Sequence, residues 1–120
     1  MLLAEDDTDL RELTITVLND HGYTVIDAVD GADAVAKYRE HSESIQLIIL
    51  DGVMPKMSGK DAYEEIRNMV PAVKAIIVTG YSEDFVREKG IDEFYVRFLL
   101  KPFSPAVLLK TVRTLLDSNI

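Results

Sequence analysis

The sequence contains no cysteine, which excludes a disulfide framework, a thiolate zinc site and a cysteine nucleophile. Basic residues are scarce, since 13 Lys and Arg against 21 Asp and Glu give a formal net charge of −8 at pH 7. A nucleic acid or an anionic membrane surface would have to be met by a basic face, so this balance argues against both as partners. Long apolar runs are also missing, because runs such as 47–50 and 75–78 are far too short to span a bilayer.

The start of the chain does not resemble a signal peptide, because residues 1–4 run directly into Glu5, Asp6 and Asp7. We see no linker, repeat or low-complexity segment in the 120 residues, which is the size of one ordinary domain. We therefore expect one domain, residues 1–120. The lack of cysteine fits a reducing compartment, and we expect a cytoplasmic location.

Short apolar runs alternate with longer amphipathic stretches, which is typical of strand–helix units around a parallel sheet. Five runs predict strands, at 1–4, 24–28, 47–50, 75–78 and 96–100. Residues 47–50 are apolar on both faces, as expected where helices cover both sides of a sheet. The expected fold is α/β, with a five-stranded parallel sheet flanked by five helices.

Apolar residues at helical spacing predict the buried faces of four of these helices. The expected stripes are Leu10, Leu13, Val17 and Leu18; Ala34, Val35 and Tyr38; Ala62, Ile66 and Met69; and Leu108, Val112, Leu115 and Leu116. A short, charged stretch at 82–89 predicts the remaining helix, packed by one side only. Ser58 with Asp61 resembles a capping box, and Ser104–Pro105 places a cap residue before a proline at the first helical position.

Polar residues interrupt the apolar pattern at the carboxyl ends of the predicted strands. Glu5 and Asp6 follow the first strand, Asp51 the third, Thr79 the fourth and Lys101 the fifth. Ligands of doubly wound sheets bind at this edge, at the crevice where the strand order reverses. In the flavodoxin-like order 2-1-3-4-5 that crevice lies between the first and third strands, so Glu5, Asp6 and Asp51 should surround it.

Three carboxylates in one crevice repel each other, so the pKa of at least one should be raised unless a cation is present. Mg²⁺ prefers such oxygen ligands, and one or two carboxylates with waters and a phosphoryl oxygen complete its octahedron. A second carboxylate can attack phosphorus, and a hydroxyl, a backbone amide and a lysine can hold the phosphoryl oxygens. These groups together indicate phosphoryl transfer, whose catalysis depends on positioning and charge stabilisation.

The motifs also resemble a known family along essentially the whole chain. They are the acidic pair Glu5–Asp6, the run Asp51-Gly-Val-Met54-Pro55 with Gly59, the pair Thr79–Gly80 and the run Lys101-Pro102-Phe103. Each motif alone is weak, but their order and their places at strand ends are specific. The sequence resembles the receiver domain of two-component response regulators, which implies a flavodoxin-like (CheY-like) fold.

The resemblance implies a role for each pocket residue. Asp51 would be the phosphoacceptor, and Asp6, with Glu5 beside it, would be a direct magnesium ligand. The backbone carbonyl of Val53 would be a further ligand. Thr79 and Lys101 would hold the phosphoryl oxygens, and a cis peptide would precede Pro102. Receivers catalyse their own phosphoryl transfer and dephosphorylation.

The family's switch aromatic corresponds to Phe98, a position where tyrosine is commoner. In the family this side chain turns inward when the threonine hydroxyl moves toward the phosphoryl group. Val53 and Tyr81 correspond to positions that flank the path of the hydrolytic water, and their bulk suggests a long-lived acyl phosphate.

The stretch 90–98 is longer than the usual link into the last strand and resembles receivers of hybrid sensor histidine kinases. We find no phosphate-cradling glycine loop, so we expect that the chain cannot make its own phosphohistidine. The resemblance implies that a partner's phosphohistidine donates the phosphoryl group. The expected partners are a sensor histidine kinase or a histidine phosphotransfer domain. If the chain is part of a hybrid kinase, the full-length protein would be a histidine kinase.

Other interpretations of these residues remain open. Taken alone, Asp51 is a common strand-ending turn residue, Asp7 favours a helix start, and His21 and His41 lie near predicted helix ends. The main alternative function is a phosphorylation-independent pseudo-receiver that acts as a protein-interaction module. A weaker alternative is a flavodoxin-like cofactor binder, which would have to place an anionic phosphate against carboxylates.

Overall fold

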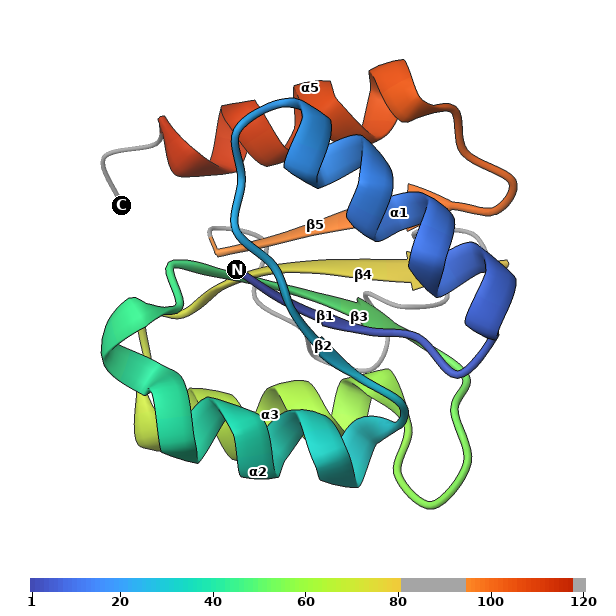
Figure 1. The fold of residues 1–120 in the computed structure, drawn as a ribbon. Helices are drawn as coiled ribbons and strands as arrows, with labels where there is room; N and C mark the ends of the chain where they lie inside the picture. Colours follow the sequence, from blue (N-terminus) through green and yellow to red (C-terminus); the bar gives the residue numbers. More distant parts are fainter. Residues whose placement is uncertain (81–94, 118–120) are drawn as a thin grey trace.

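A sheet of five parallel strands forms the centre of the computed structural model, which describes residues 1–80 and 95–117 (Figure 1). The strands are β1 (Leu2–Ala4), β2 (Ile26–Ala28), β3 (Leu47–Asp51), β4 (Lys74–Thr79) and β5 (Val96–Leu100). Their order is β2-β1-β3-β4-β5. The predicted strands, their order and the flavodoxin-like class are therefore confirmed.

The central strands are buried on both faces, and successive residues enter two different cores. Ile48 and Leu50 of β3 belong to the core that also contains Tyr38. Leu47 and Ile49 belong to the core on the opposite face. Since side chains alternate along a strand, a stretch covered on both sides has to be apolar at successive positions, as residues 47–50 of β3 are before the strand ends at Asp51.

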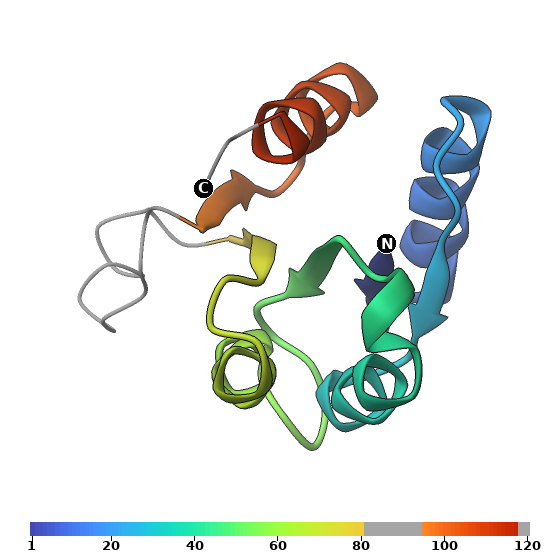
Figure 2. The same cartoon turned by 90° about the vertical axis from the view of Figure 1, so that its left-hand side faces the viewer.

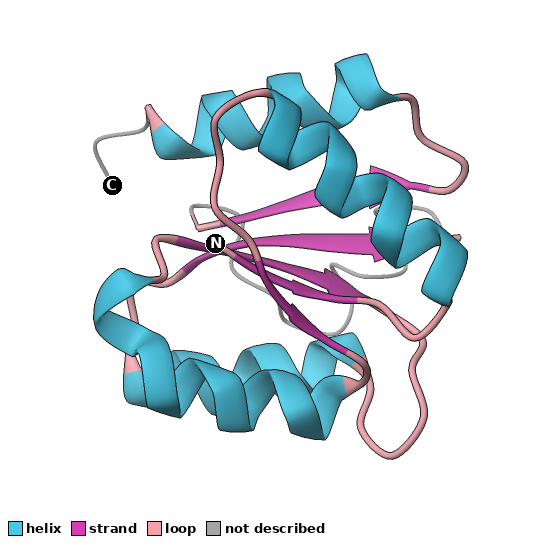
Figure 3. Cartoon of the chain, in the orientation of Figure 1, coloured by secondary structure: helices cyan, strands magenta, loops and turns pink. Residues whose placement is uncertain are grey.

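Helices cover both faces of the sheet. Those described are α1 (Thr8–Asp20), α2 (Gly31–His41), the short 3₁₀ helix η1 (Ser42–Ser44), α3 (Gly59–Met69) and α5 (Pro105–Leu116). Figures 1 and 2 show α1 and α5 on one face and α2 and α3 on the other, and Figure 3 shows the sheet between the two helical layers. The helix predicted at 82–89 lies outside the described residues. Within the described part, no helix has both the length and the apolar character that crossing a bilayer requires.

Side-chain caps explain where the helices begin. Asp7 accepts from the Leu10 N–H at 3.0 Å, so its helix-start interpretation is confirmed. Ser58 accepts from the Asp61 N–H at 3.1 Å, and Ser104 is the N-cap of α5 with proline in the first turn, both as predicted. Each cap satisfies a backbone donor that has no partner within the helix.

Two of the predicted buried positions are wrong. Leu13 is 58% exposed, and the buried residues of α1 are Thr14 and Leu18. Thr14 can be buried because its hydroxyl donates to the Leu10 carbonyl at 2.7 Å. The buried face of α1 therefore includes Thr14 and Leu18, and Leu13 lies outside it. Met69, the last residue of α3, is 38% exposed because the helix ends there.

Candidate functional site

The register of β1 and β3 brings the first carboxylates together. Ala4 pairs with Leu50, so Glu5 and Asp51 are the next residues on two neighbouring parallel strands. Both lie at the carboxyl edge of the sheet, at the point where the strand order reverses. This is the place predicted for a ligand in a doubly wound sheet.

The register of β4 and β5 adds two more polar residues to the same edge. Asp51 pairs with Val78, so Thr79 lies one residue farther along the neighbouring strand. Thr79 in turn pairs with Leu100, the residue before Lys101. The Lys101 N–H donates to the Thr79 carbonyl at 2.9 Å, which ties the residue after β5 to the end of β4.

Three carboxylates form the centre of the site. Glu5, Asp6 and Asp51 each offer an oxygen, and these oxygens lie within 4.8 Å of one another. Glu5 and Asp51 are each only 4% exposed, whereas Asp6 is exposed. The predicted cluster of three carboxylates is therefore present, with two of them buried and the third exposed to solvent.

Asp51 is held by one contact at each carboxylate oxygen. The Val53 N–H donates to Oδ1 at 3.2 Å, and the Lys101 ammonium donates to Oδ2 at 2.9 Å. Lys101 Nζ also lies 3.6 Å from Glu5 Oε1. One cation therefore bridges two buried carboxylates that come from strands far apart in the chain.

The pocket changes the pKa of Glu5 and of Lys101. Burial, together with the neighbouring Asp51, raises the pKa of Glu5 from about 4.5 to about 7, although Lys101 and the Asp7 N–H oppose this. Burial alone would lower the pKa of Lys101, but the carboxylates of Asp51 and Glu5 raise it above its ordinary value. Glu5 is therefore a carboxyl with a raised pKa, as the sequence predicted for at least one acid of this crevice.

Glycine allows the loop after β3 to fold back on the strand. A Cβ on Gly59 would lie 2.2 Å from the Asp51 carbonyl oxygen. The Gly59 N–H also donates to the Gly52 carbonyl at 3.2 Å. The start of α3 therefore packs directly on the backbone of Asp51, which explains why glycine stands eight positions after the aspartate.

The remaining predicted site residues lie around this centre. Thr79 is 5% exposed at the end of β4, and the side chain of Val53 is 67% exposed beside the pocket. Phe98 is half-buried and packs against the core that contains Tyr38. The peptide before Pro102 is cis, as expected. Tyr81 lies outside the described residues.

The donor set of the pocket fits Mg²⁺. Among the residues that the structure describes, the three carboxylates are opposed by the ammonium of Lys101, which leaves two negative charges uncompensated when all three acids are ionised. Carboxylate oxygens are the ligands that this hard cation prefers, and the exposure of Asp6 leaves room for the waters it retains. Glu5, Asp6 and Asp51 are therefore the side chains that could hold the ion.

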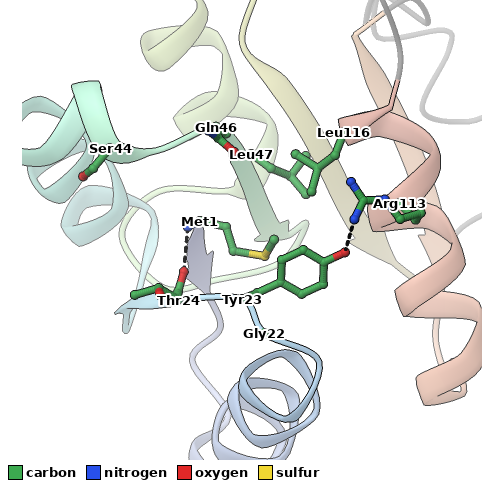
Figure 4. A pocket seen from close by; sticks show the side chains of 9 residues that line it. All are labelled: Met1, Gly22, Tyr23, Thr24, Ser44, Gln46, Leu47, Arg113 and Leu116. Carbon is green, nitrogen blue, oxygen red and sulfur yellow. Dashed lines mark hydrogen bonds between the residues drawn. The ribbon is translucent and has the colours of Figure 1, made fainter.

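A hollow of about 410 Å³ lies at the opposite, amino edge of the sheet (Figure 4). Its lining includes Met1, Tyr23 and Arg113, and the Arg113 guanidinium donates to the Tyr23 hydroxyl at 3.3 Å. No carboxylate is among the described residues that line it, so it does not offer the chemistry of the acidic pocket. His21 and His41 stand at helix ends, as predicted, and neither belongs to the acidic pocket.

The sequence prediction missed one residue beside the pocket. Arg11 of α1 donates to the main-chain carbonyl of Glu5 at 2.7 Å. Its place on a polar helix face gave no indication of this contact, because side-chain reach is not visible in a periodic pattern.

The model of the response regulator receiver domain matches residues 1–113. The chain is also similar to Sensor kinase CckA of Brucella abortus (strain 2308), with 36% identity over 120 residues. That match covers 99% of this chain but only 13% of the sensor kinase, so the chain spans a small part of this relative's length.

Solved structures show the same similarity. A chain of the CheX-CheY-BeF3-Mg+2 complex from Borrelia burgdorferi has a TM-score of 0.88 and 27% identity, with coverage of 98% of this chain and 88% of that one. The receiver domain from Hybrid Histidine Kinase CckA has a TM-score of 0.82 and 28% identity, and the match covers 97% of both chains.

Proposed function

This chain belongs to the response regulator receiver domain family, and on that basis we propose that Asp51 accepts a phosphoryl group from a partner's phosphohistidine. The observation that carries the proposal is the contact of Lys101 with both Asp51 and Glu5. A turn aspartate with a purely structural role does not need a buried neighbouring acid and a shared ammonium. We extend the proposed receiver domain over residues 1–120.

The proposed transfer is an in-line displacement at phosphorus. A carboxylate oxygen of Asp51 forms a bond to phosphorus while the bond between phosphorus and the partner's histidine nitrogen breaks. The electron pair of that bond returns to the ring, which leaves as neutral imidazole when its other nitrogen carries a proton. The products are an acyl phosphate on Asp51 and an unmodified histidine, so atoms and charge balance.

The residues around Asp51 position and neutralise the transferred group. Lys101, already 2.9 Å from Oδ2, supplies positive charge, and Thr79 offers a hydroxyl at the neighbouring strand end. Asp6, Asp51 and the carbonyl of Val53 would hold Mg²⁺, with Glu5 beside them. When bound, the ion supplies charge that stabilises the phosphoryl oxygens.

Phosphorylation is expected to act as a conformational switch. The added group brings negative charge and acceptor oxygens, which compete for Lys101 and attract the Thr79 hydroxyl. Movement of Thr79 leaves space on the sheet, into which Phe98 of β5 turns. Phe98 is half-buried and packs on the core, so a rotation inward would bury more apolar surface.

The donor and the output are supplied by other domains. A sensor histidine kinase or a histidine phosphotransfer domain carries the phosphohistidine, and the similarity to a sensor kinase supports a place in a hybrid kinase. We propose a cytoplasmic location and no nucleic-acid or membrane contact by this domain, in keeping with its net charge of −8.

Incubation with acetyl phosphate and Mg²⁺, followed by intact-protein mass spectrometry, tests the proposal. We expect an added phosphate in the parent chain and none in Asp51→Asn. Asp20→Asn is the matched control, because Asp20 is exposed at the far end of α1 and should leave labelling unchanged. If the folded parent chain shows no labelling, and beryllofluoride with Mg²⁺ also leaves its amide shifts unchanged, the pseudo-receiver alternative replaces the proposal.

A further inference from the structure

Arg11 connects the acidic pocket to two neighbouring elements. It lies on α1, and its side chain is only 13% exposed. Nη1 donates to the main-chain carbonyl of Glu5 at 2.7 Å, and Nε lies 3.5 Å from the Asp27 carboxylate of β2. A guanidinium with this little exposure is held by these contacts and does not move freely in solvent.

The contact completes the hydrogen bonding of Glu5. The Glu5 N–H donates to the Ala28 carbonyl at 3.1 Å, and Glu5 Oε2 accepts from the Asp7 N–H at 3.0 Å. Arg11 supplies the donor for the carbonyl, the main-chain group that lies between the Glu5 and Asp6 side chains. Because the peptide unit is planar, a fixed Glu5 carbonyl also fixes the Asp6 N–H and the direction in which Asp6 leaves the strand.

We propose that Arg11 is a positioning residue for the Glu5–Asp6 acidic pair, acting through the Glu5 carbonyl and braced by Asp27. The proposal rests on the function above, because the pair it orients is the one that would hold Mg²⁺. Groups that orient metal ligands without touching the metal commonly change metal affinity by about 10- to 100-fold. Arg11 would orient the acidic pair in this way, because it contacts the main chain of Glu5 and would not touch the metal.

The sign of the effect separates positioning from simple electrostatics. Arg11 is a cation that contacts the main chain of the acidic pair, so if its charge alone mattered, removing it would strengthen the binding of Mg²⁺. If it positions the ligands, removing it weakens binding despite the gain in negative potential. The two explanations therefore predict opposite changes in one dissociation constant.

The experiment measures Mg²⁺ affinity by NMR titration of the full chain with the metal alone. Arg11→Met keeps the apolar stem and removes the donors, and we expect its affinity to fall by about tenfold or more. Arg11→Lys keeps charge and a donor and should recover part of the loss. Arg39→Met is the matched control, because Arg39 is exposed on α2 and its substitution should change nothing. An Arg11→Met affinity equal to or higher than that of the parent chain overturns the proposal.

A second readout needs no metal and keeps the inference separate from the proposed function. Amide hydrogen exchange in the metal-free chain should accelerate at Glu5 and Asp7 in Arg11→Met and stay unchanged at Ile49 in the core. If the parent chain fails to bind Mg²⁺, the proposed function fails, while exchange still decides whether Arg11 orders the pair. Unchanged exchange at Glu5 and Asp7 refutes the positioning role, and if Arg11→Met does not fold, Arg11→Lys decides by the same two measurements.

Discussion

Replacing Gly59 by alanine should destabilise the protein, although an ordinary glycine-to-alanine change within a helix stabilises it by about 0.5–1 kcal/mol. The added Cβ would lie 2.2 Å from the Asp51 carbonyl oxygen, 2.9 Å from the Asp51 carbonyl carbon and 3.0 Å from the Gly52 Cα. All three atoms belong to the backbone, so no flexible side chain can move aside. The start of α3 has to shift away from the end of β3.

The magnitude follows from this geometry. Overpacking in a well-packed region costs about 1–3 kcal/mol, and a clash between two backbone segments belongs at the upper end. For a chain of this size, a loss of about 3 kcal/mol lowers the melting temperature by roughly 10 °C. Because the clash is with Asp51 itself, the variant should also label more slowly with acetyl phosphate.

Urea and thermal unfolding followed by circular dichroism measure the loss, with Gly80→Ala as the matched control. A Cβ on Gly80 meets nothing within 4 Å, so this variant should stay within about 0.5 kcal/mol of the parent. Equal stability of Gly59→Ala and Gly80→Ala would refute the close packing of α3 on the phosphoacceptor strand.

Three further predictions concern protonation, acyl phosphate lifetime and helix capping. The pKa of Glu5 is raised to about 7, so in metal-free protein the folded state binds the extra proton and stability falls as pH rises from about 4.5 to 7, by at most about 3 kcal/mol. Glu5→Gln removes this dependence, so its free energy of unfolding in urea, relative to that of the parent chain, should be higher at pH 8 than at pH 5. An equal difference between variant and parent at both pH values would contradict the prediction. Val53→Asn should speed hydrolysis of the acyl phosphate by roughly tenfold, or ~1.4 kcal/mol, because an amide that can bind water replaces an exposed apolar side chain beside Asp51. Mass spectrometry over time measures the decay of the acyl phosphate. An unchanged decay rate would count against the idea that Val53 shields the acyl phosphate from water. Ser104→Ala removes the acceptor for the Val107 N–H at 3.2 Å and should destabilise the protein by about 1 kcal/mol in urea unfolding, whereas no loss would mean that the cap is dispensable.

The sheet could be predicted from the sequence because its burial leaves few choices. Residues 47–50 of β3, which helices cover on both faces, have to be apolar at successive positions, and a run of this kind is visible without any structure. The site followed from the same pattern, since Glu5, Asp51 and Lys101 break the apolar runs where the strands end. Parallel strands place these breaks at one edge, so their clustering depends only on the strand order.

Other features depend on packing that a periodic pattern does not contain. The apolar spacing predicts Leu13 in the core, but the buried face of α1 includes Thr14 instead, whose hydroxyl is bonded to the helix backbone. The close approach of Gly59 to Asp51 depends on the path of a loop. The contact of Arg11 with Glu5 depends on the reach of a long side chain across two elements.

The most direct test of Asp51 as phosphoacceptor is to locate the phosphoryl group in the chain. After brief incubation with acetyl phosphate and Mg²⁺, borohydride reduction converts an acyl phosphate on aspartate into homoserine, which peptide mass spectrometry assigns to a position. We expect homoserine at position 51 alone, and only when Mg²⁺ was present. Homoserine at position 6 or at another aspartate, with position 51 unmodified, would contradict the proposed role of Asp51.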